Sequence, residues 1–257
     1  MIRRDRIQDA VGKDHPDYLA CINNLANCYH TMERHGDALP LYVECREGMG
    51  RMLGKDHPDY LSCINNMANC YKAMDRHSDA LLLYVECREG RGRVLGKDHP
   101  EYLTCLYNMA TCCQEMGRHG DALPLYVECR EGMALVLGKD HLDYLSCLRH
   151  MASCNRVMDR YSYAIPLYEE CRKGLARVCG KDHPKYLTCI IELAKCYKMN
   201  KQYGDALPLF MEYRQVAGRV MGKQSLGYHE CLYDIANCYR MVEIGRASCR
   251  ERVCELV

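Results

Sequence analysis

The stretch GKDHPDYLSCINNMANCYKAMDRHSDALLLYVECREGRGRVL, residues 54–95, decides the fold because the chain repeats it in modified form every 42 residues. The copy at residues 12–53 differs from it at only nine of 42 positions. A fixed period of this size predicts a linear array of units and overrides chain length as a guide to domain number. A glycine begins each copy: Gly12, Gly54, Gly96, Gly138, Gly180 and Gly222.

Each unit begins with the pattern of an amphipathic helix. Apolar residues three and four positions apart predict one buried face of this first helix, which spans about residues 58–75 in the second unit. Pro58 and Asp59 suit its first turn, where proline's missing N–H needs no partner and an acid faces the positive end of the helix dipole. In the first unit the apolar positions are Leu19, Ile22, Leu25, Ala26 and Tyr29.

A second helix follows in each unit. We expect Arg34-His35-Gly36-Asp37 to form the turn and Gly54 to end the second helix after about Leu53. Pro40 is expected in its first turn, where it removes no intrahelical donor. Neither helix buries its apolar face alone, so the units must stack. The sequence therefore predicts an all-α solenoid of antiparallel helix pairs, with Ala38, Leu41, Tyr42 and Cys45 in its core.

Charge and hydropathy exclude several classes of protein. The chain has 35 Lys and Arg against 34 Asp and Glu, so no overall field attracts nucleic acid or a membrane surface. No apolar run reaches the roughly 18 residues of a transmembrane helix, and the first residues lack the apolar stretch of a signal peptide. We expect a cytoplasmic protein without nucleic-acid or membrane partners.

The cysteine content, 20 residues, is high, but the spacing favours free, buried thiols. A ladder of disulfides or of metal ligands is the alternative, and no Cys-x-x-Cys pair supports a zinc site. We expect no metal and no cofactor. Sixteen cysteines recur at three positions of the repeat, which the second unit represents by Cys63, Cys70 and Cys87.

These positions carry a resemblance to a known family. Ala26, Tyr29, Ala38 and Tyr42, with Cys45 in an alanine position, have the relative spacing of the tetratricopeptide pattern, lengthened from its usual ~34 residues. The phrases at 64–68, 95–100 and 122–126 resemble the repeats of kinesin light chains and of nephrocystin-3-type proteins. The resemblance extends from Gly12 to about Val242. It implies a right-handed superhelix whose first helices line a concave face that binds extended peptides.

One polar stripe of the first helix would lie on that concave face. It ends in a basic residue in most units, and Glu230 is its single acid. We therefore expect a groove for an acidic peptide, with an apolar or aromatic anchor entering between units near Tyr107 or Tyr233. A stripe that is polar only because it faces water is the alternative. The resemblance to kinesin light chains implies cargo contact for Asn23 and Asn65. The expected peptide-binding residues are Asn23, Asn27, His30, Asn65, Asn69, Lys72, Tyr107, Thr111, Gln114, Arg149, Ser153, Arg156, Lys195, Lys198, Tyr233, Asn237 and Arg240.

The ends of the chain depart from the repeat. Residues 1–11 align with the end of a second helix and are expected to be the remnant of a preceding unit. Residues 12–242 contain five full units and a sixth first helix. Residues 243–257 lose the pattern and resemble a translated sequencing adapter, so we expect an artefact there; a polar capping segment is the alternative.

Periodicity also argues against an enzyme. His15 and Asp14 recur in later units, whereas a catalytic site would break the repeat, and no phosphate-binding loop or His-Glu-x-x-His motif occurs. We expect a protein-interaction scaffold that binds a partner's acidic segment as kinesin light chains bind cargo or adaptors. The competing function is a structural or self-associating scaffold, because apolar helix faces at the ends would stack chains end to end.

Overall fold

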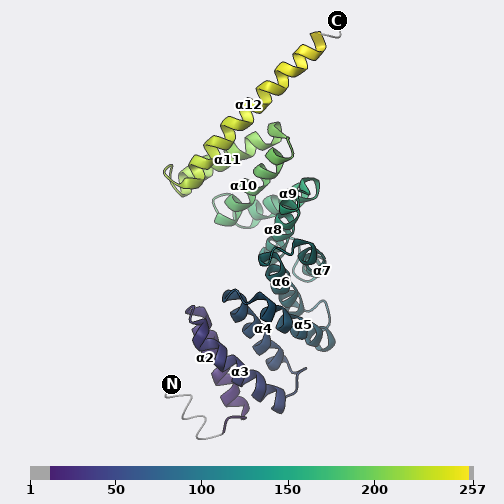
Figure 1. Ribbon diagram of the computed structural model, residues 1–257, viewed down its shortest axis with the longest axis vertical. Coiled ribbons are helices and arrows are strands. Elements are labelled where there is room, and N and C mark those ends of the chain that lie inside the picture. Colours follow the sequence, from purple (N-terminus) through teal and green to yellow (C-terminus); the bar gives the residue numbers. More distant parts are fainter. Residues whose placement is uncertain (1–11, 255–257) are drawn as a thin grey trace. The chain divides into compact units, whose positions relative to one another are not determined.

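The computed structural model describes residues 12–254, and the side chains of residues 12–244. These residues form eleven α-helices and no strand (Figure 1), which confirms the all-α class. The chain divides into two compact units after Val136, and each is described by itself. The interpretation of residues 1–11 lies outside the described residues.

Each of the two compact units is built from helix pairs. The first contains α2 (Pro16–Thr31), α3 (His35–Met52), α4 (Pro58–Ala73), α5 (His77–Val94), α6 (Pro100–Glu115) and α7 (His119–Val136). The second contains α8 (Leu142–Val157), α9 (Tyr161–Val178), α10 (Pro184–Met199), α11 (Tyr203–Val220) and α12 (Leu226–Cys254). Within a compact unit, the first helix of each repeat packs on the second helix of the same repeat and on the second helix of the preceding repeat. The first helices of successive repeats also touch.

The recurring histidines begin the first helices. His57 precedes α4 with an extended backbone, and its Nδ1 accepts the backbone N–H of Asp59 at 3.2 Å. This bond satisfies one of the donors that a helix start leaves unpaired. The same cap occurs at His15, His99, His141 and His183. These histidines are therefore structural.

The recurring aspartates bind the end of the second helix. Asp14 accepts from Arg51 at 2.7 Å, and Asp56 accepts from Arg93 at 2.6 Å. Asp140 and Asp182 pair in the same way with Arg177 and Arg219. At the end of α3, Gly54 takes a φ of +84°, a left-handed conformation that suits glycine. The predicted stop after Leu53 is confirmed, since α3 ends at Met52 and Leu53 caps it.

The predicted turn is wrong by about three residues. Gly36 and Asp37 lie inside the first turn of α3, and the chain reverses through Met32, Glu33 and Arg34. Glu33 takes a φ of +58° at this reversal. Asp37 accepts from Arg34 at 2.8 Å instead, where an acid also faces the positive end of the helix dipole.

The expected place of Pro40 is wrong for the same reason. Because α3 begins at His35, Pro40 is its sixth residue and lies inside the helix. It removes the backbone donor that would have bonded the carbonyl of Gly36. The second unit of the repeat has Leu82 at this position, so proline is not required there.

The predicted core is confirmed, except that Leu25 and Tyr29 are only partly buried against it. Ile22, Ala38, Tyr42 and Cys45 are fully buried, and equivalent residues are buried in the later repeats. Buried thiols bond backbone carbonyls across helices, as Cys45 does to Leu19 at 3.5 Å. The described cysteines are free thiols, and most are buried, although Cys28 is exposed. Burial raises the pKa of Cys196 to about 12, which makes that thiol a poor nucleophile.

A glycine of the second helix allows the two helices of a pair to approach closely. A Cβ atom at Gly90 would lie 2.4 Å from Cδ2 of Leu61, and the same clash recurs at Gly48, Gly132 and Gly174. Gly92 has no such constraint, since its nearest neighbour would be Tyr102 at 3.4 Å. The repeated Glu-Gly phrase therefore marks a helix contact.

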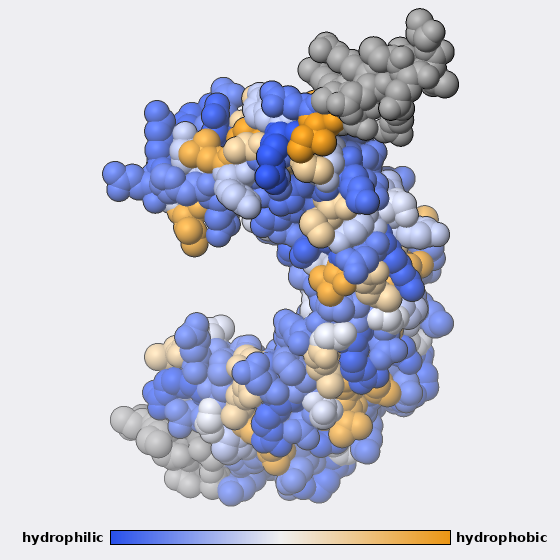
Figure 2. Space-filling view, turned by 45° about the horizontal axis from the view of Figure 1, so that its top comes forward, coloured by the Kyte–Doolittle hydropathy of each residue, from blue (hydrophilic) through white to orange (hydrophobic). Residues whose placement is uncertain are grey.

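The last helix crosses the predicted boundary of the repeat array. α12 runs from Leu226 to Cys254, so the helix continues beyond residue 242 into the segment expected to be an artefact. The origin of that segment stays a prediction. On the face shown in Figure 2 the surface is mostly hydrophilic, with small separate hydrophobic patches. Among the described residues no helix is both long and apolar enough to span a membrane.

Candidate partner-binding site

An open hollow of about 650 Å³ lies among the first helices of the second compact unit. Its walls come from the end of α8, the last two turns of α10, the early part of α12, and the α8–α9 connection with the first residue of α9. Four of the predicted peptide-binding residues meet there. The lining residues are Arg156, Val157, Asp159, Tyr161, Lys195, Lys198, Met199, Glu230, Tyr233 and Asp234.

Apolar side chains in the hollow are exposed to an unusual degree. Val157 and Met199 end α8 and α10, and they are 49% and 56% exposed. Tyr233 on α12 is 73% exposed. Covering exposed apolar side chains of this size contributes favourably to the free energy of binding a partner.

The cations of the hollow have acidic neighbours. Nε of Arg156 lies 2.9 Å from Oε2 of Glu192, and Nζ of Lys198 lies 2.7 Å from Oδ1 of Asp234. Lys195 is held less closely, since its Nζ is 3.9 Å from Oε1 of Glu192 and its side chain is 38% exposed. The hollow is therefore mixed in charge, and Lys195 is its most available cation.

The position of Lys195 has a different role in the first repeats. In the first two repeats the equivalent residue is an asparagine that bonds a buried tyrosine: Asn27 accepts from Tyr42 at 2.7 Å, and Asn69 accepts from Tyr84 at 2.5 Å. In the third and fourth repeats it is Thr111 and Ser153. In the fifth repeat the tyrosine is replaced by Phe210, which has no hydroxyl to satisfy. The residue at position 195 therefore has no tyrosine hydroxyl to bond, and it is a lysine that lines the hollow.

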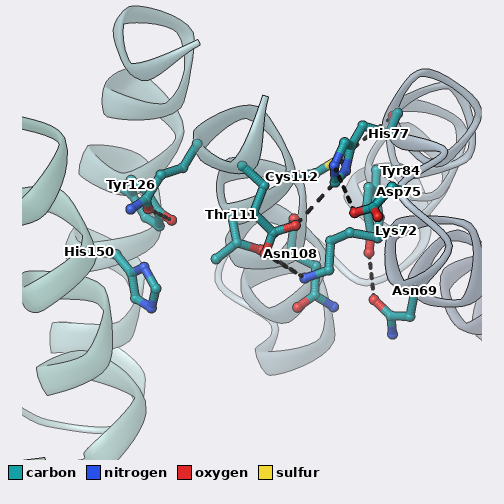
Figure 3. A network of polar contacts seen from close by, with 12 residues as sticks. Asn69, Lys72, Asp75, His77, Tyr84, Asn108, Thr111, Cys112, Tyr126 and His150 are labelled. Atoms are coloured by element: carbon teal, nitrogen blue, oxygen red, sulfur yellow. Dashed lines mark hydrogen bonds and ion pairs between the residues drawn. The ribbon is translucent and has the colours of Figure 1, made fainter. Parts of the chain in front are cut away.

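In the first compact unit, the predicted amide ladder is used inside the fold. Asn69 accepts from the Tyr84 hydroxyl at 2.5 Å (Figure 3), and Gln114 accepts from Tyr126 at 2.8 Å. Burial raises the pKa of Tyr84, which keeps its hydroxyl protonated as a donor. These amides satisfy buried tyrosines, so their availability to a peptide is limited.

The other predicted residues of this unit are also engaged or enclosed. Lys72 donates to Thr111 at 3.2 Å and lies 3.9 Å from Glu115. Tyr107 packs edge-on against Tyr126, and Asn65 is only 7% exposed. The amide oxygens of Asn23 and Asn65 are buried and find no hydrogen-bond partner among the described residues. His30 lies beside His35.

In the second compact unit, the remaining predicted residues lie outside the lining of the hollow. Arg149 approaches Nε2 of His150 at 2.9 Å, and Ser153 is half-buried. Arg240 donates to Asn237 at 3.1 Å on the exposed side of α12. The expected stripe therefore converges only in part, through Arg156, Lys195, Lys198 and Tyr233.

Some lining residues were missed by the sequence analysis. Val157 and Met199 follow the last stripe position by one residue, where the first repeats have Thr31 and Ala73. Apolar residues outside the buried pattern were the signal that could have identified them. Asp234 stands at a position that is asparagine in the first three repeats, and its acidic character became relevant only once Lys198 was placed beside it.

Comparisons with known proteins match this architecture. The tetratricopeptide repeat family model matches residues 18–92, 65–134, 107–175 and 146–218. No curated protein matches the sequence. Among solved structures, the nearly identical TPR-like repeats of a kinesin light chain-like protein from Podosopora anserina share 23% identity with a TM-score of 0.71, covering 82% of this chain and 99% of that chain.

Two further solved structures are similar. BtubC (BKLC) from P. vanneervenii has 15% identity and a TM-score of 0.70, covering 87% of this chain and 89% of its own. YrrB, a TPR protein with an unusual peptide-binding site, has 12% identity and a TM-score of 0.60, covering 88% and 96%. At these identities the likeness concerns the fold alone.

Proposed function

Because the chain belongs to the tetratricopeptide repeat family, we propose that it is a protein-interaction scaffold whose hollow among α8, α10 and α12 receives an apolar or aromatic side chain from an extended partner segment. A carboxylate of that segment lies beside Lys195. The observation that carries the proposal is the hollow itself, in which exposed Met199 and Tyr233 adjoin an incompletely paired lysine. A cargo or adaptor segment, as in kinesin light chains, is the kind of partner we expect.

The free energies of the two kinds of contact show that the apolar anchor supplies most of the binding affinity. An exposed ion pair contributes about 0.2–1 kcal/mol, whereas micromolar binding needs roughly 8 kcal/mol. Burying an aromatic side chain of 150–250 Å² at ~25 cal/mol per Å² contributes about 4–6 kcal/mol. Lys195 therefore sets the orientation and preference of the segment, while the anchor supplies most of the affinity.

The mixed charge of the hollow limits which partner segments can bind there. Asp159 accepts from Tyr161 at 2.6 Å, and Glu230 is exposed on α12. These carboxylates would repel a continuous acidic run. The proposed segment therefore carries one or two acids next to its anchor, with neutral residues beyond them.

A labelled peptide with one tryptophan beside an aspartate tests the proposal by fluorescence anisotropy. We expect Tyr233→Ala to weaken binding at least about tenfold, because truncating a central aromatic residue of an interface costs upwards of ~1.4 kcal/mol of binding free energy. Tyr163→Ala is the matched control, since Tyr163 is 67% exposed on α9 and does not line the hollow. Equal effects of the two variants would contradict the proposed site.

A charge reversal tests the orientation. Lys195→Glu should weaken binding of the aspartate peptide about threefold to fivefold and strengthen binding of the same peptide with lysine in place of aspartate. Lys185→Glu, on the same helix outside the hollow, should change neither affinity. Binding that needs neither tryptophan nor Tyr233, together with concentration-dependent self-association in light scattering, would favour the alternative of a self-associating scaffold.

A further inference from the structure

Three potential metal ligands converge in the first compact unit, far along the chain from the hollow. They are His30 at the end of α2, His35 at the start of α3 and Cys70 near the end of α4. One ligand atom from each lies within 4.8 Å of the other two. The Nδ1 atoms of His30 and His35 are 3.1 Å apart, and their rings are tilted at 49° to one another.

This arrangement fits the dimensions of a zinc site. Zinc binds nitrogen at about 2.0–2.1 Å and thiolate sulfur at about 2.3 Å, which places tetrahedral ligand atoms about 3.3–3.6 Å from one another. The two imidazoles are already at nearly this separation, and a small movement of the Cys70 thiol closes the triad. Two imidazoles and one thiolate form a ligand set that zinc accepts, and the fourth position remains open for water.

We propose that His30, His35 and Cys70 bind a zinc-class divalent cation at the junction of the first and second repeats. The ion would link three helices, because each ligand comes from a different one. The fourth ligand would be water or an external donor, as in sites that keep an open coordination position. Binding releases the proton of the Cys70 thiol, and the two imidazoles bind in their neutral form.

The protonation state of His30 supports this chemistry, whereas that of Cys70 opposes it. Burial and the neighbouring His35 lower the pKa of His30, which keeps its imidazole neutral near pH 7. Burial raises the pKa of Cys70, so the bond between the cation and the sulfur must offset the cost of releasing that proton. Cys70 meanwhile donates to the backbone carbonyl of His35 at 3.6 Å, which holds the sulfur beside the imidazole pair.

The neighbouring repeat shows that the triad is not a general property of the fold. The equivalent residues there are Lys72, His77 and Cys112. Sγ of Cys112 is 3.8 Å from Nδ1 of His77, but Lys72 replaces the third ligand and points toward Thr111 (Figure 3). The first repeat thus differs from the second by a single ligand, and this difference provides an internal control.

Cobalt(II) titration of the reduced full-length chain tests the proposal, because a Co²⁺–thiolate bond gives a charge-transfer band and tetrahedral Co²⁺ gives intense visible absorption. We expect one Co²⁺ per chain, displaced by Zn²⁺. His30→Lys, which installs the residue of the second repeat, should lower Zn²⁺ affinity at least about 100-fold, since even loss of an outer-shell partner costs about 10–100-fold. The paired change His77→Gln and Cys112→Ala should leave binding unchanged.

A gain of binding completes the test. Lys72→His should create a second site, and the chain should then bind two Co²⁺ ions. Circular dichroism without metal checks that each variant retains its helices. The proposal would be overturned by any of three results: the band persists in His30→Lys, the band is lost in the His77/Cys112 variant, or Co²⁺ absorbs without thiolate charge transfer. The histidine pair would then be a simple His–His hydrogen bond.

Discussion

Replacing Tyr84 with alanine is expected to lower the free energy of unfolding by about 3–5 kcal/mol. The Tyr84 side chain on α5 is fully buried, and its hydroxyl donates to Oδ1 of Asn69 at 2.5 Å. The substitution opens a cavity between the helices and leaves the half-buried Asn69 amide without its donor. Urea unfolding followed by circular dichroism measures the loss.

Two controls separate the contributions at this position. Tyr84→Phe keeps the ring and removes only the hydrogen bond, so we expect a loss of about 0.5–1.5 kcal/mol. The fifth repeat has Phe210 at the equivalent position, also fully buried, which shows that the space accepts phenylalanine. Tyr163→Ala should change the free energy of unfolding by less than about 0.5 kcal/mol because that residue is exposed. Similar losses for Tyr84→Ala and Tyr163→Ala would contradict the described core.

Replacing Arg91 with methionine is expected to raise the free energy of unfolding by about 1–4 kcal/mol. Arg91 is only 4% exposed, and its Nε is buried without a hydrogen-bond partner among the described residues. Its other nitrogens bond the Glu101 carbonyl at 2.7 Å and approach the Glu101 carboxylate at 3.3 Å. Removing a buried charge whose hydrogen bonds are incomplete relieves a desolvation cost, and the partner carboxylate of Glu101, whose side chain is 48% exposed, is not left as a buried charge.

Other repeats of this chain have methionine at the position of Arg91. Met49 and Met133 occupy the equivalent positions in the first and third repeats, and both are buried. The reverse change, Met133→Arg, should lower the free energy of unfolding because it buries a charge. A destabilised Arg91→Met protein would show instead that the Arg91–Glu101 contact is net favourable.

Periodicity was sufficient to predict the helix pairs, because each apolar position recurs with the same neighbours. The stop at Gly54 was predictable for a similar reason, since a glycine after an apolar helix end adopts the left-handed backbone. The reversal at Glu33 was not, because Gly36 and Asp37 are also typical turn residues. The third repeat held the missing signal: Gly117 stands where Glu33 takes its positive φ.

The binding site was harder to predict than the fold. A polar residue on the first helix can face solvent or bond a buried hydroxyl, and sequence spacing does not distinguish these outcomes. Asn27 and Asn69 bond tyrosines, whereas Lys195 lines the hollow in a repeat that has Phe210 in place of the tyrosine. The sequence held only a partial signal at two positions 15 residues apart: asparagine with tyrosine in the first two repeats, and Lys195 with Phe210 in the fifth. The third and fourth repeats keep the tyrosine but have Thr111 and Ser153 at the first position.

Hydrogen–deuterium exchange with and without the tryptophan–aspartate peptide shows whether the hollow receives the partner segment. We expect slower exchange at the end of α8, in the last turns of α10 and in residues 226–234 of α12, with α9 and α11 unchanged away from the hollow. Tyr233→Ala should remove this protection under the same peptide concentration. Protection confined to α9 and α11, or equal protection in the Tyr233→Ala variant, would contradict the assignment of the hollow as the partner-binding site.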